Sequence, residues 1–244
     1  MTSGERSVRS EMEGEVAVVT LARPDKRNAL DVAMLESIRE AQLLAESRGA
    51  RAMVLCGEGP VFCAGADLSG VRESDFHLVL NEVLLAFTEL PIPVVAHAHG
   101  SALGAGVQLL AVSDLRVATA NCVVGVPAAR LGLVVHHWTV QRLVREFTPA
   151  VARAMLLAAE TYDATRLHAI GAVHRIGDFD SALQWAHELS RMAPLSMRGH
   201  KLALDADSLT DAVRDSRITA LDSDDAREGR LAFSEKRPPR FSGQ

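Results

Sequence analysis

The sequence predicts an α/β fold, and two patterns in it point to that class. Short apolar runs rich in β-branched residues, as in 16–21, 52–55 and 94–96, alternate with longer segments whose apolar residues recur at helical spacing. Glycine and proline mark many of the boundaries between them. Because strand and helix segments recur with loops at the strand ends, we expect an α/β architecture and not an all-β sandwich.

The first half of the chain divides into strands and helices at recognisable turns. Asp31 is placed to cap a helix that runs to Gly49, and Pro91-Ile92-Pro93 ends a helix that begins near Phe76. The apolar run after Gly106 predicts a short buried helix. In chain order we expect a strand over 16–21, a helix over 31–49, a strand over 52–55, a helix over 76–90, a strand over 94–96, a helix over 107–113 and a strand over 115–118.

The remainder of the chain is predicted to be mostly helical. From about Pro149 onward, apolar residues recur at helical spacing over 151–159, 164–170, 180–192 and 196–204. The last stretch, from Asp205, is charged and has few apolar residues before Phe233 and Phe241. Such a segment does not build a core of its own, so we expect it to pack against a neighbouring subunit.

Size and composition indicate a soluble protein with one large domain, or a domain with an appendage. The chain has 244 residues, and its net charge of −5 gives no support for nucleic acid or an anionic membrane surface as a partner. The 3 cysteines are widely spaced, as expected for reduced thiols in the cytoplasm. The polar residues 1–15 do not form a signal peptide, and no apolar run reaches the roughly 20 residues of a transmembrane segment.

Two glycine-rich loops carry the strongest functional signal. The first is Phe62-Cys63-Ala64-Gly65-Ala66-Asp67-Leu68, the second is Gly100-Ser101-Ala102-Leu103-Gly104-Ala105-Gly106-Val107-Gln108, and Pro127-Ala128-Ala129-Arg130-Leu131-Gly132 follows. Small residues let the backbone approach a ligand closely. With the strand between the loops, these segments resemble the crotonase (enoyl-CoA hydratase/isomerase) superfamily, and the resemblance covers about residues 14 to 243.

The resemblance implies a right-handed spiral of ββα repeats, followed by C-terminal helices that form trimers or hexamers (dimers of trimers). It assigns residues 1–195 to the spiral core with the acyl-CoA site and 196–244 to a helical oligomerisation segment. Three segments are most similar to an actinobacterial acyl-CoA-binding branch that lacks both catalytic glutamates. They are Gly-Ala-Gly-Val-Gln at 104–108, His-His-Trp at 136–138 and Glu-Lys-Arg-Pro-Pro at 235–239.

The resemblance also implies where an acyl-CoA would bind. Its oxyanion hole, a pair of N–H donors for the thioester oxygen, falls on the backbone amides of Ala66 and Ala105. Lys26 and Arg27 are explained equally well as solvated turn charges, and Asp67 as a helix N-cap. The full set of implied CoA contacts is Lys26, Arg27, Ala29, Ala64, Asp67 and Leu68.

The acids that hydration needs are absent from the sequence. Hydratases of the superfamily place glutamates where this chain has Gln108 and Ala128. Hydration needs one group that activates water and another that protonates the α-carbon. The amide of Gln108 and the methyl group of Ala128 cannot transfer protons in this way. His136 and His137 are the candidates to replace these acids, although we favour a packing role beside Trp138.

The other reactive side chains have structural explanations. Glu146 is expected on an outer helix, and Cys63 is expected as a small buried side chain. His97 and His99 share one side of a strand, but no third metal ligand follows at a recognisable interval. We therefore expect no metal and no other cofactor, and a hydrogen bond from His99 that supports the loop at Gly100.

These observations predict a protein that binds fatty acyl-CoA without turnover, as a carrier in fatty-acid metabolism with fatty-acid-synthesis enzymes as candidate partners. The alternative is an active enoyl-CoA hydratase, or another lyase, isomerase or thioesterase of the superfamily, with unconventional acid–base residues. A purely structural subunit is disfavoured by the retained Lys26, Ala66 and Ala105. Gln108 and Ala128 distinguish binding without turnover from an active enzyme, and they favour binding. Candidates for the far end of the acyl pocket are Leu84, Leu85, Phe87, Leu133, Val134, Val135 and Trp138.

Overall fold

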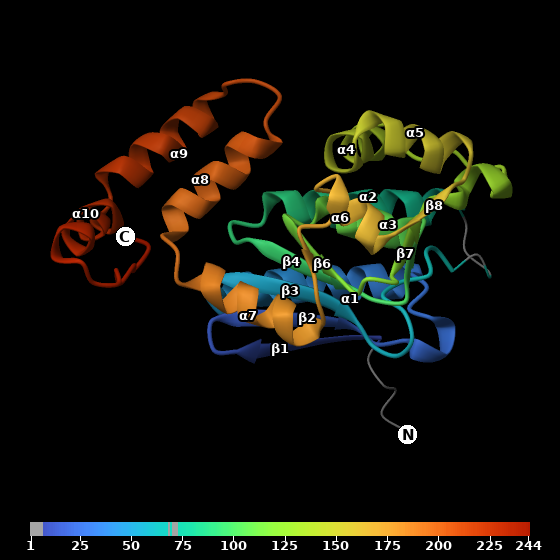
Figure 1. Cartoon of the computed structure of the whole chain (residues 1–244), viewed down its shortest axis with the longest axis horizontal. Coiled ribbons are helices and arrows are strands. Elements are labelled where there is room, and N and C mark those ends of the chain that lie inside the picture. Colours follow the sequence, from blue (N-terminus) through green and yellow to red (C-terminus); the bar gives the residue numbers. More distant parts are fainter. Residues whose placement is uncertain (1–6, 68, 70–72) are drawn as a thin grey trace.

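The computed structural model describes residues 7–67, 69 and 73–244, and its centre is a six-stranded sheet (Figure 1). The strands lie in the order β1-β2-β3-β4-β6-β9; β1 pairs antiparallel with β2, and the other pairs are parallel. A smaller sheet has three strands. The larger sheet contains β1 (Val8–Glu13), β2 (Val16–Leu21), β3 (Ala52–Gly57), β4 (Val94–Ala98), β6 (Leu115–Ala118) and β9 (Arg175–Ile176), and the smaller one β5 (Ser101–Leu103), β7 (Val123–Gly125) and β8 (Thr161–Asp163).

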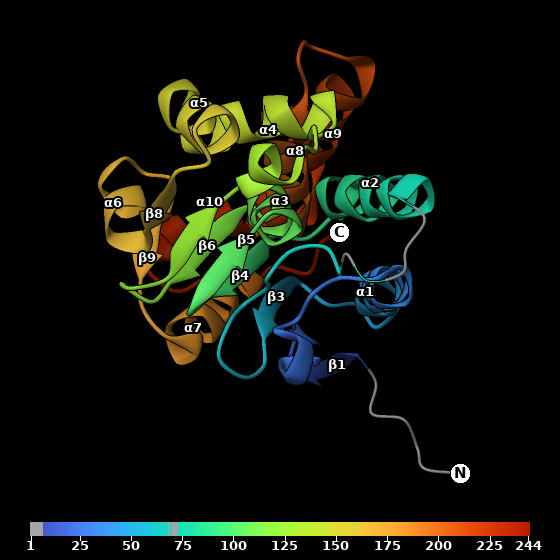
Figure 2. The same ribbon diagram turned by 90° about the vertical axis from the view of Figure 1, so that its right-hand side faces the viewer.

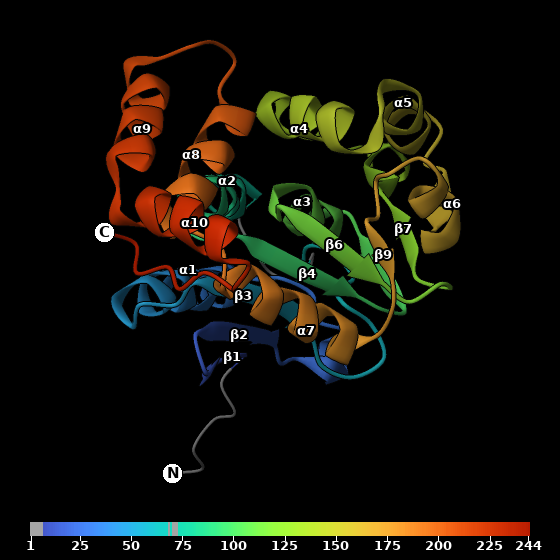
Figure 3. The same cartoon turned by 60° about the vertical axis from the view of Figure 1, so that its left-hand side comes forward.

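Helices cover both faces of the larger sheet (Figures 2 and 3). On one side lie α1 (Val32–Ser47), α2 (Glu73–Glu89) and α3 (Ala105–Val112), and on the other lies α7 (Phe179–Ser190). Neighbouring residues of β3 show this division, because Leu55 belongs to the main hydrophobic core whereas Val54 packs in a second cluster with Ala182 of α7. A strand covered on both faces has a continuous apolar run instead of an alternating one.

A further layer of helices lies above α3 (Figure 2). It consists of α4 (His137–Phe147), which contacts α3, and α5 (Pro149–Leu157), which contacts α4. The helix α6 (Ala164–Ala169) follows β8, and two short 3₁₀ turns, η1 (Pro24–Lys26) and η2 (Pro127–Leu131), precede α1 and α4. None of the helices in the part of the chain that the structure describes is long and apolar enough to cross a membrane.

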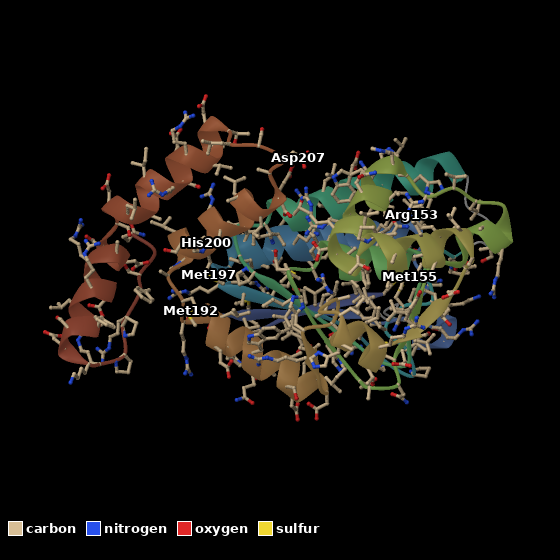
Figure 4. The ribbon with its side chains drawn as sticks, turned by 45° about the horizontal axis from the view of Figure 1, so that its top comes forward. Arg153, Met155, Met192, Met197, His200 and Asp207 are labelled. Atoms are coloured by element: carbon tan, nitrogen blue, oxygen red, sulfur yellow. The ribbon has the colours of Figure 1, made fainter. Side chains whose placement is uncertain are left out.

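The last three helices form an arm that extends from the body, as Figure 1 shows. This C-terminal arm comprises α8 (Pro194–Asp205), α9 (Asp211–Asp222) and α10 (Asp224–Glu235). Figure 4 follows its beginning through Met192, Met197, His200 and Asp207. The predicted boundary between residues 195 and 196 falls at the start of α8, and the division into a core and an oligomerisation segment remains a prediction.

Buried charges join the arm to the body. Lys201 of α8 donates hydrogen bonds to the carboxylate of Asp114 at 2.9 Å and to the carbonyl of Ile92 at 3.1 Å. Arg142 of α4 is buried and forms an ion pair with Asp205 at the end of α8. Two buried cations thus fix the position of α8 on the body.

Eleven helices and strands predicted in the sequence are present within a few residues of their expected bounds, which confirms the α/β class. The helix expected from residue 107 begins at Ala105. The edge strand β1 was missed, because its outward side chains at Arg9, Glu11 and Glu13 are polar. The helix α4 was missed, although Val140, Leu143, Val144 and Phe147 recur at helical spacing; its buried side also carries the polar Thr139 and Arg142. The remaining elements, β5, β7, β8, β9, α9 and α10, were not predicted individually.

Replacing Lys201 by methionine tests the anchoring of the arm. We expect a loss of about 3 kcal/mol in the free energy of unfolding at pH 7, because Asp114 then keeps an unpaired, mostly buried charge. Burial already raises the pKa of Asp114, and Lys201 opposes that effect. A carboxyl group with a raised folded-state pKa destabilises the fold above that pKa, and this cost disappears as the pH falls through it.

The loss caused by Lys201→Met should therefore shrink between pH 7 and about pH 5 in urea titrations. The double variant Asp114→Asn/Lys201→Met is the control, since it has no carboxyl group at this position to titrate. A loss that is equally large at both pH values would contradict the role of the Asp114 charge.

Candidate active site

The two glycine-rich loops lie side by side, and backbone hydrogen bonds between them set the distance between their main chains. Cys63 N donates to the carbonyl of Ser101 at 3.1 Å, and Leu103 N donates to the carbonyl of Cys63 at 2.9 Å. A Cβ atom at Gly106 would lie 2.6 Å from the Cys63 carbonyl oxygen. Gly65 has φ +107°, and a Cβ atom there would lie 2.9 Å from the Leu103 carbonyl oxygen. Glycine is required at these two positions because any side chain would separate the loops.

The amides of Ala66 and Ala105 remain available for a ligand. Leu30 N donates to the Gly65 carbonyl and Asp67 N donates to the Leu30 carbonyl, so the intervening N–H of Ala66 faces away from Leu30. Ala105 is the first residue of α3, where an N–H has no partner within the helix. The positive end of the helix dipole also favours negative charge at this place.

Both amides belong to residues that line one cavity of about 150 Å³. Of the residues proposed for acid–base chemistry, the oxyanion hole and CoA contacts, six meet there: Ala64, Ala66, Ala105, Gln108, Ala128 and His136. None of the described lining residues is an aspartate or a glutamate. The cavity thus has the two predicted backbone donors and no carboxylate in its described wall.

Gln108 is held in one orientation by α4. The hydroxyl of Thr139 donates to Gln108 Oε1 at 3.3 Å. With its oxygen engaged in this way, the amide presents N–H donors to the cavity, and it has no proton to exchange near neutral pH. Ala128, in η2, contributes only a methyl group to the wall.

The structure separates the two candidate histidines. His136 lines the cavity, whereas His137 faces a groove on the outer side of α4. His136 is the N-cap of α4, and its Nδ1 accepts a hydrogen bond from Trp138 N at 3.3 Å. The capping bond assigns the proton of the neutral ring to Nε2. Of the two, only His136 lies where it could act on a ligand in this cavity.

The segment expected to contact CoA lies beside the first loop. Ala64 N donates to the carbonyl of Arg27 at 3.0 Å, and the side chains of Lys26 and Arg27 are exposed. Ala29 lies between these residues and Leu30. Leu68 lies outside the described residues, so its predicted role stays a prediction.

Asp67 has a defined structural partner. Its carboxylate accepts hydrogen bonds from the backbone and side chain of Ser69 and forms an ion pair with Arg23 at 3.3 Å. The Ser69 bonds are the main reason that the pKa of Asp67 is lowered, and Arg23 adds to the effect. Asp67 therefore holds a local turn with Ser69, and its predicted contact with CoA stays a prediction.

The remaining candidates lie away from the cavity wall or are inert. Glu146 lies on α4, a helix of the outer layer as expected, and its carboxylate accepts a hydrogen bond from the buried Arg116 at 2.6 Å. Burial raises the pKa of the Cys63 thiol to about 12, which keeps it protonated. His99 Nε2 lies 2.9 Å from the Gly59 carbonyl oxygen, which confirms the predicted loop support. Among the described residues, no group of three or more His, Cys, Asp and Glu side chains is arranged to hold a metal ion.

Three polar residues of the cavity wall were missed in the sequence: His77, Asn81 and Thr139. Thr139 holds Gln108, and Asn81 of α2 lies in the wall, with its Oδ1 buried and without a partner in the described structure. Asn81 follows the helical spacing of its lining neighbours Leu80 and Leu84, so the predicted helix over 76–90 contained the signal. Thr139 lies in α4, which was not predicted although its apolar residues recur at helical spacing. Of the candidates for the far end of the pocket, Leu84, Leu133, Val134 and Val135 line the cavity, and Leu85, Phe87 and Trp138 do not.

Comparison with known proteins gives the same family as the resemblance of the two glycine-rich loops. The family described as enoyl-CoA hydratase/isomerase matches residues 11–244. The chain belongs to this family. A probable enoyl-CoA hydratase of Mycobacterium tuberculosis is 38% identical over 233 residues, which cover 93% of this chain and 96% of that protein. The 2,3-dehydroadipyl-CoA hydratase of Escherichia coli is 33% identical over 256 residues, which cover 94% and 96%.

Solved structures of enoyl-CoA hydratase/isomerase family proteins confirm the crotonase-type fold. A putative enoyl-CoA hydratase from Streptomyces coelicolor has a TM-score of 0.89 at 30% identity, covering 100% of this chain and 97% of that one. An enoyl-CoA hydratase/carnithine racemase from Magnetospirillum magneticum has a TM-score of 0.87 at 30% identity, covering 98% and 96%. The helical arm is included in these matches, since nearly the whole chain is covered.

Replacing Gly106 by alanine tests the contact between the loops. The added methyl group meets the Cys63 carbonyl, so we expect a loss of about 1–3 kcal/mol in the free energy of unfolding. Gly229→Ala is the matched control. It is also a helical glycine, but its added Cβ meets only the Phe241 ring at 3.6 Å. We expect this control to be neutral or to stabilise by up to about 1 kcal/mol in the same urea titration. Equal effects of the two changes would contradict the close approach at Gly106.

Proposed function

We propose that this enoyl-CoA hydratase/isomerase family member binds fatty acyl-CoA thioesters and holds them without hydrating them. The observation that carries the proposal is the content of one cavity: two available backbone amides, Gln108 and Ala128, and no carboxylate among its described lining residues. The backbone N–H groups of Ala66 and Ala105 donate hydrogen bonds to the thioester oxygen. A carrier or delivery role in fatty-acid metabolism follows, as in an acyl-CoA-binding branch without catalytic glutamates.

The missing proton-transfer groups explain why turnover is not expected. Hydration requires a base for water and an acid for the α-carbon, and each contributes roughly 10²–10⁴-fold to the rate. The two residues nearest to these tasks are an amide and a methyl group. The oxyanion hole alone stabilises charge on the thioester oxygen but moves no proton. Binding is therefore retained and the chemical step is lost.

The second candidate function is hydration that uses His136. It is favoured by one observation, the position of this histidine in the cavity wall. It is also favoured by the names of the relatives, which are hydratases or probable hydratases. Against it, Nδ1 is engaged as the cap of α4, so Nε2–H offers the cavity a donor and not a free base.

We also propose a homotrimer, or a hexamer built from two trimers, assembled through the C-terminal arm. Large apolar side chains are exposed on all three of its helices, and Phe233 is 88% exposed. Exposed apolar residues gathered on one segment are typical of protein interfaces. A cytoplasmic location and fatty-acid-synthesis enzymes as partners belong to the same proposal.

Binding without turnover is the first test. We expect calorimetry to show binding of butyryl- and decanoyl-CoA, and we expect crotonyl- and decenoyl-CoA to be hydrated no faster than in buffer alone. The double variant Gln108→Glu/Ala128→Glu supplies both missing carboxylates to the same oxyanion hole. If it gains hydratase activity, the wild-type site is complete except for these groups. Failure of the wild type to bind any acyl-CoA would sink the proposal.

The role of His136 is tested by its conservative replacement. His136→Asn keeps a side chain that can cap α4, and it removes the titratable ring. We expect unchanged folding and no effect on hydration, because there is no turnover to lose. Measurable hydration by the wild type that disappears in His136→Asn, but persists in His137→Asn, would establish the second function instead.

A further inference from the structure

The cavity has room for only part of a fatty acyl chain. Its volume is about 150 Å³, and an apolar cavity of about that size in another protein holds one benzene molecule. An acyl group of about six carbons therefore fills the space. A longer chain requires a route out of the cavity.

One part of the cavity wall is apolar and faces solvent. Leu131 and Val134 line the cavity, yet they are 55% and 90% exposed. The apolar residues that α2 adds to the wall are different, because Phe76, Leu80 and Leu84 are at most 5% exposed, although the exposed His77 of α2 also lines the cavity. The lining thus passes from the buried interior to the surface without losing its apolar character.

The backbone beside these exposed residues is irregular. Residues 133–136 lie between η2 and α4 and belong to neither a helix nor a strand. Gly132 has φ +70°, which directs the chain into this segment after η2. The segment ends at His136, which is also exposed and lines the cavity. The exposed part of the wall therefore carries two apolar side chains, Leu131 and Val134, and the polar ring of His136.

We infer that acyl chains longer than about six carbons leave the cavity past Leu131 and Val134, and that these two side chains select for long chains. The inference rests on the proposed acyl-CoA binding and deepens it by naming the acyl class and the residues that recognise it. Each methylene group of the ligand that becomes fully buried lowers the dissociation constant by about fourfold, and each one covered on a single side lowers it by about twofold. Leu131 and Val134 cover the acyl chain on a single side.

The test is a series of calorimetric titrations with butyryl-, hexanoyl-, octanoyl- and decanoyl-CoA. For the wild type, the dissociation constant should fall by about fourfold per methylene up to hexanoyl-CoA and by about twofold per methylene from there to decanoyl-CoA. In Leu131→Asp and Val134→Asp, the ratio of the butyryl to the decanoyl dissociation constant should drop by about tenfold. Leu157→Asp is the matched control. This residue of α5 is 75% exposed and lies outside the cavity wall, so the wild-type ratio should persist.

Three results would overturn the inference. The first is a wild-type affinity that stops rising at hexanoyl-CoA. The second is an equal loss for butyryl- and decanoyl-CoA in Val134→Asp, which would place the opening on the CoA side. The third is an unchanged ratio with a lower oligomeric mass in sedimentation, which would make these residues a contact between protein copies. A wild type that does not bind butyryl-CoA fails differently, because it removes the proposed function together with this inference.

Discussion

The contact between two backbone segments at Cys63 and Gly106 is the constraint on which the site depends. The first loop follows β3, the second contains β5 and the first residues of α3, and both are held by hydrogen bonds between main-chain atoms. Only glycine at position 106 allows this distance. The same contact fixes the start of α3, and therefore the direction in which the Ala105 amide points. The side chains around the site therefore pack onto a backbone arrangement that this contact has fixed.

A second set of interactions transmits this geometry to α4. Thr139 of α4 donates a hydrogen bond to Gln108 of α3. One turn further along both helices, Arg142 Nε donates to the carbonyl of Ala111 at 2.8 Å. Arg142 also forms an ion pair with Asp205 of the arm. The orientation of the cavity's polar groups thus depends on a buried cation shared by three helices, where an apolar residue would pack but would fix no direction.

The sequence was informative where chemistry and local conformation coincide. Glycine at fixed spacing marked the two loops, and the residues that follow them, Gln108 and Ala128, were placed in the cavity wall without any structural information. It was uninformative where the answer depends on the direction of a side chain. Which of His136 and His137 faces the cavity is decided by the residue at which α4 begins. That start is set by the His136 cap, which the spacing of the apolar residues in α4 does not reveal.

The pairing of Cys63 with Ala102 has a consequence for folding. The two residues are far apart in the chain, and all of β4 and α2 lie between them. Contacts of such long range form only after the intervening elements are in place, because loop closure is costly before the rest of the fold compensates for it. The cavity consequently exists only in the complete native state. A ligand that occupies it shifts the equilibrium of the whole chain toward that state by mass action, so slower hydrogen exchange is expected throughout the body and not only at the two loops.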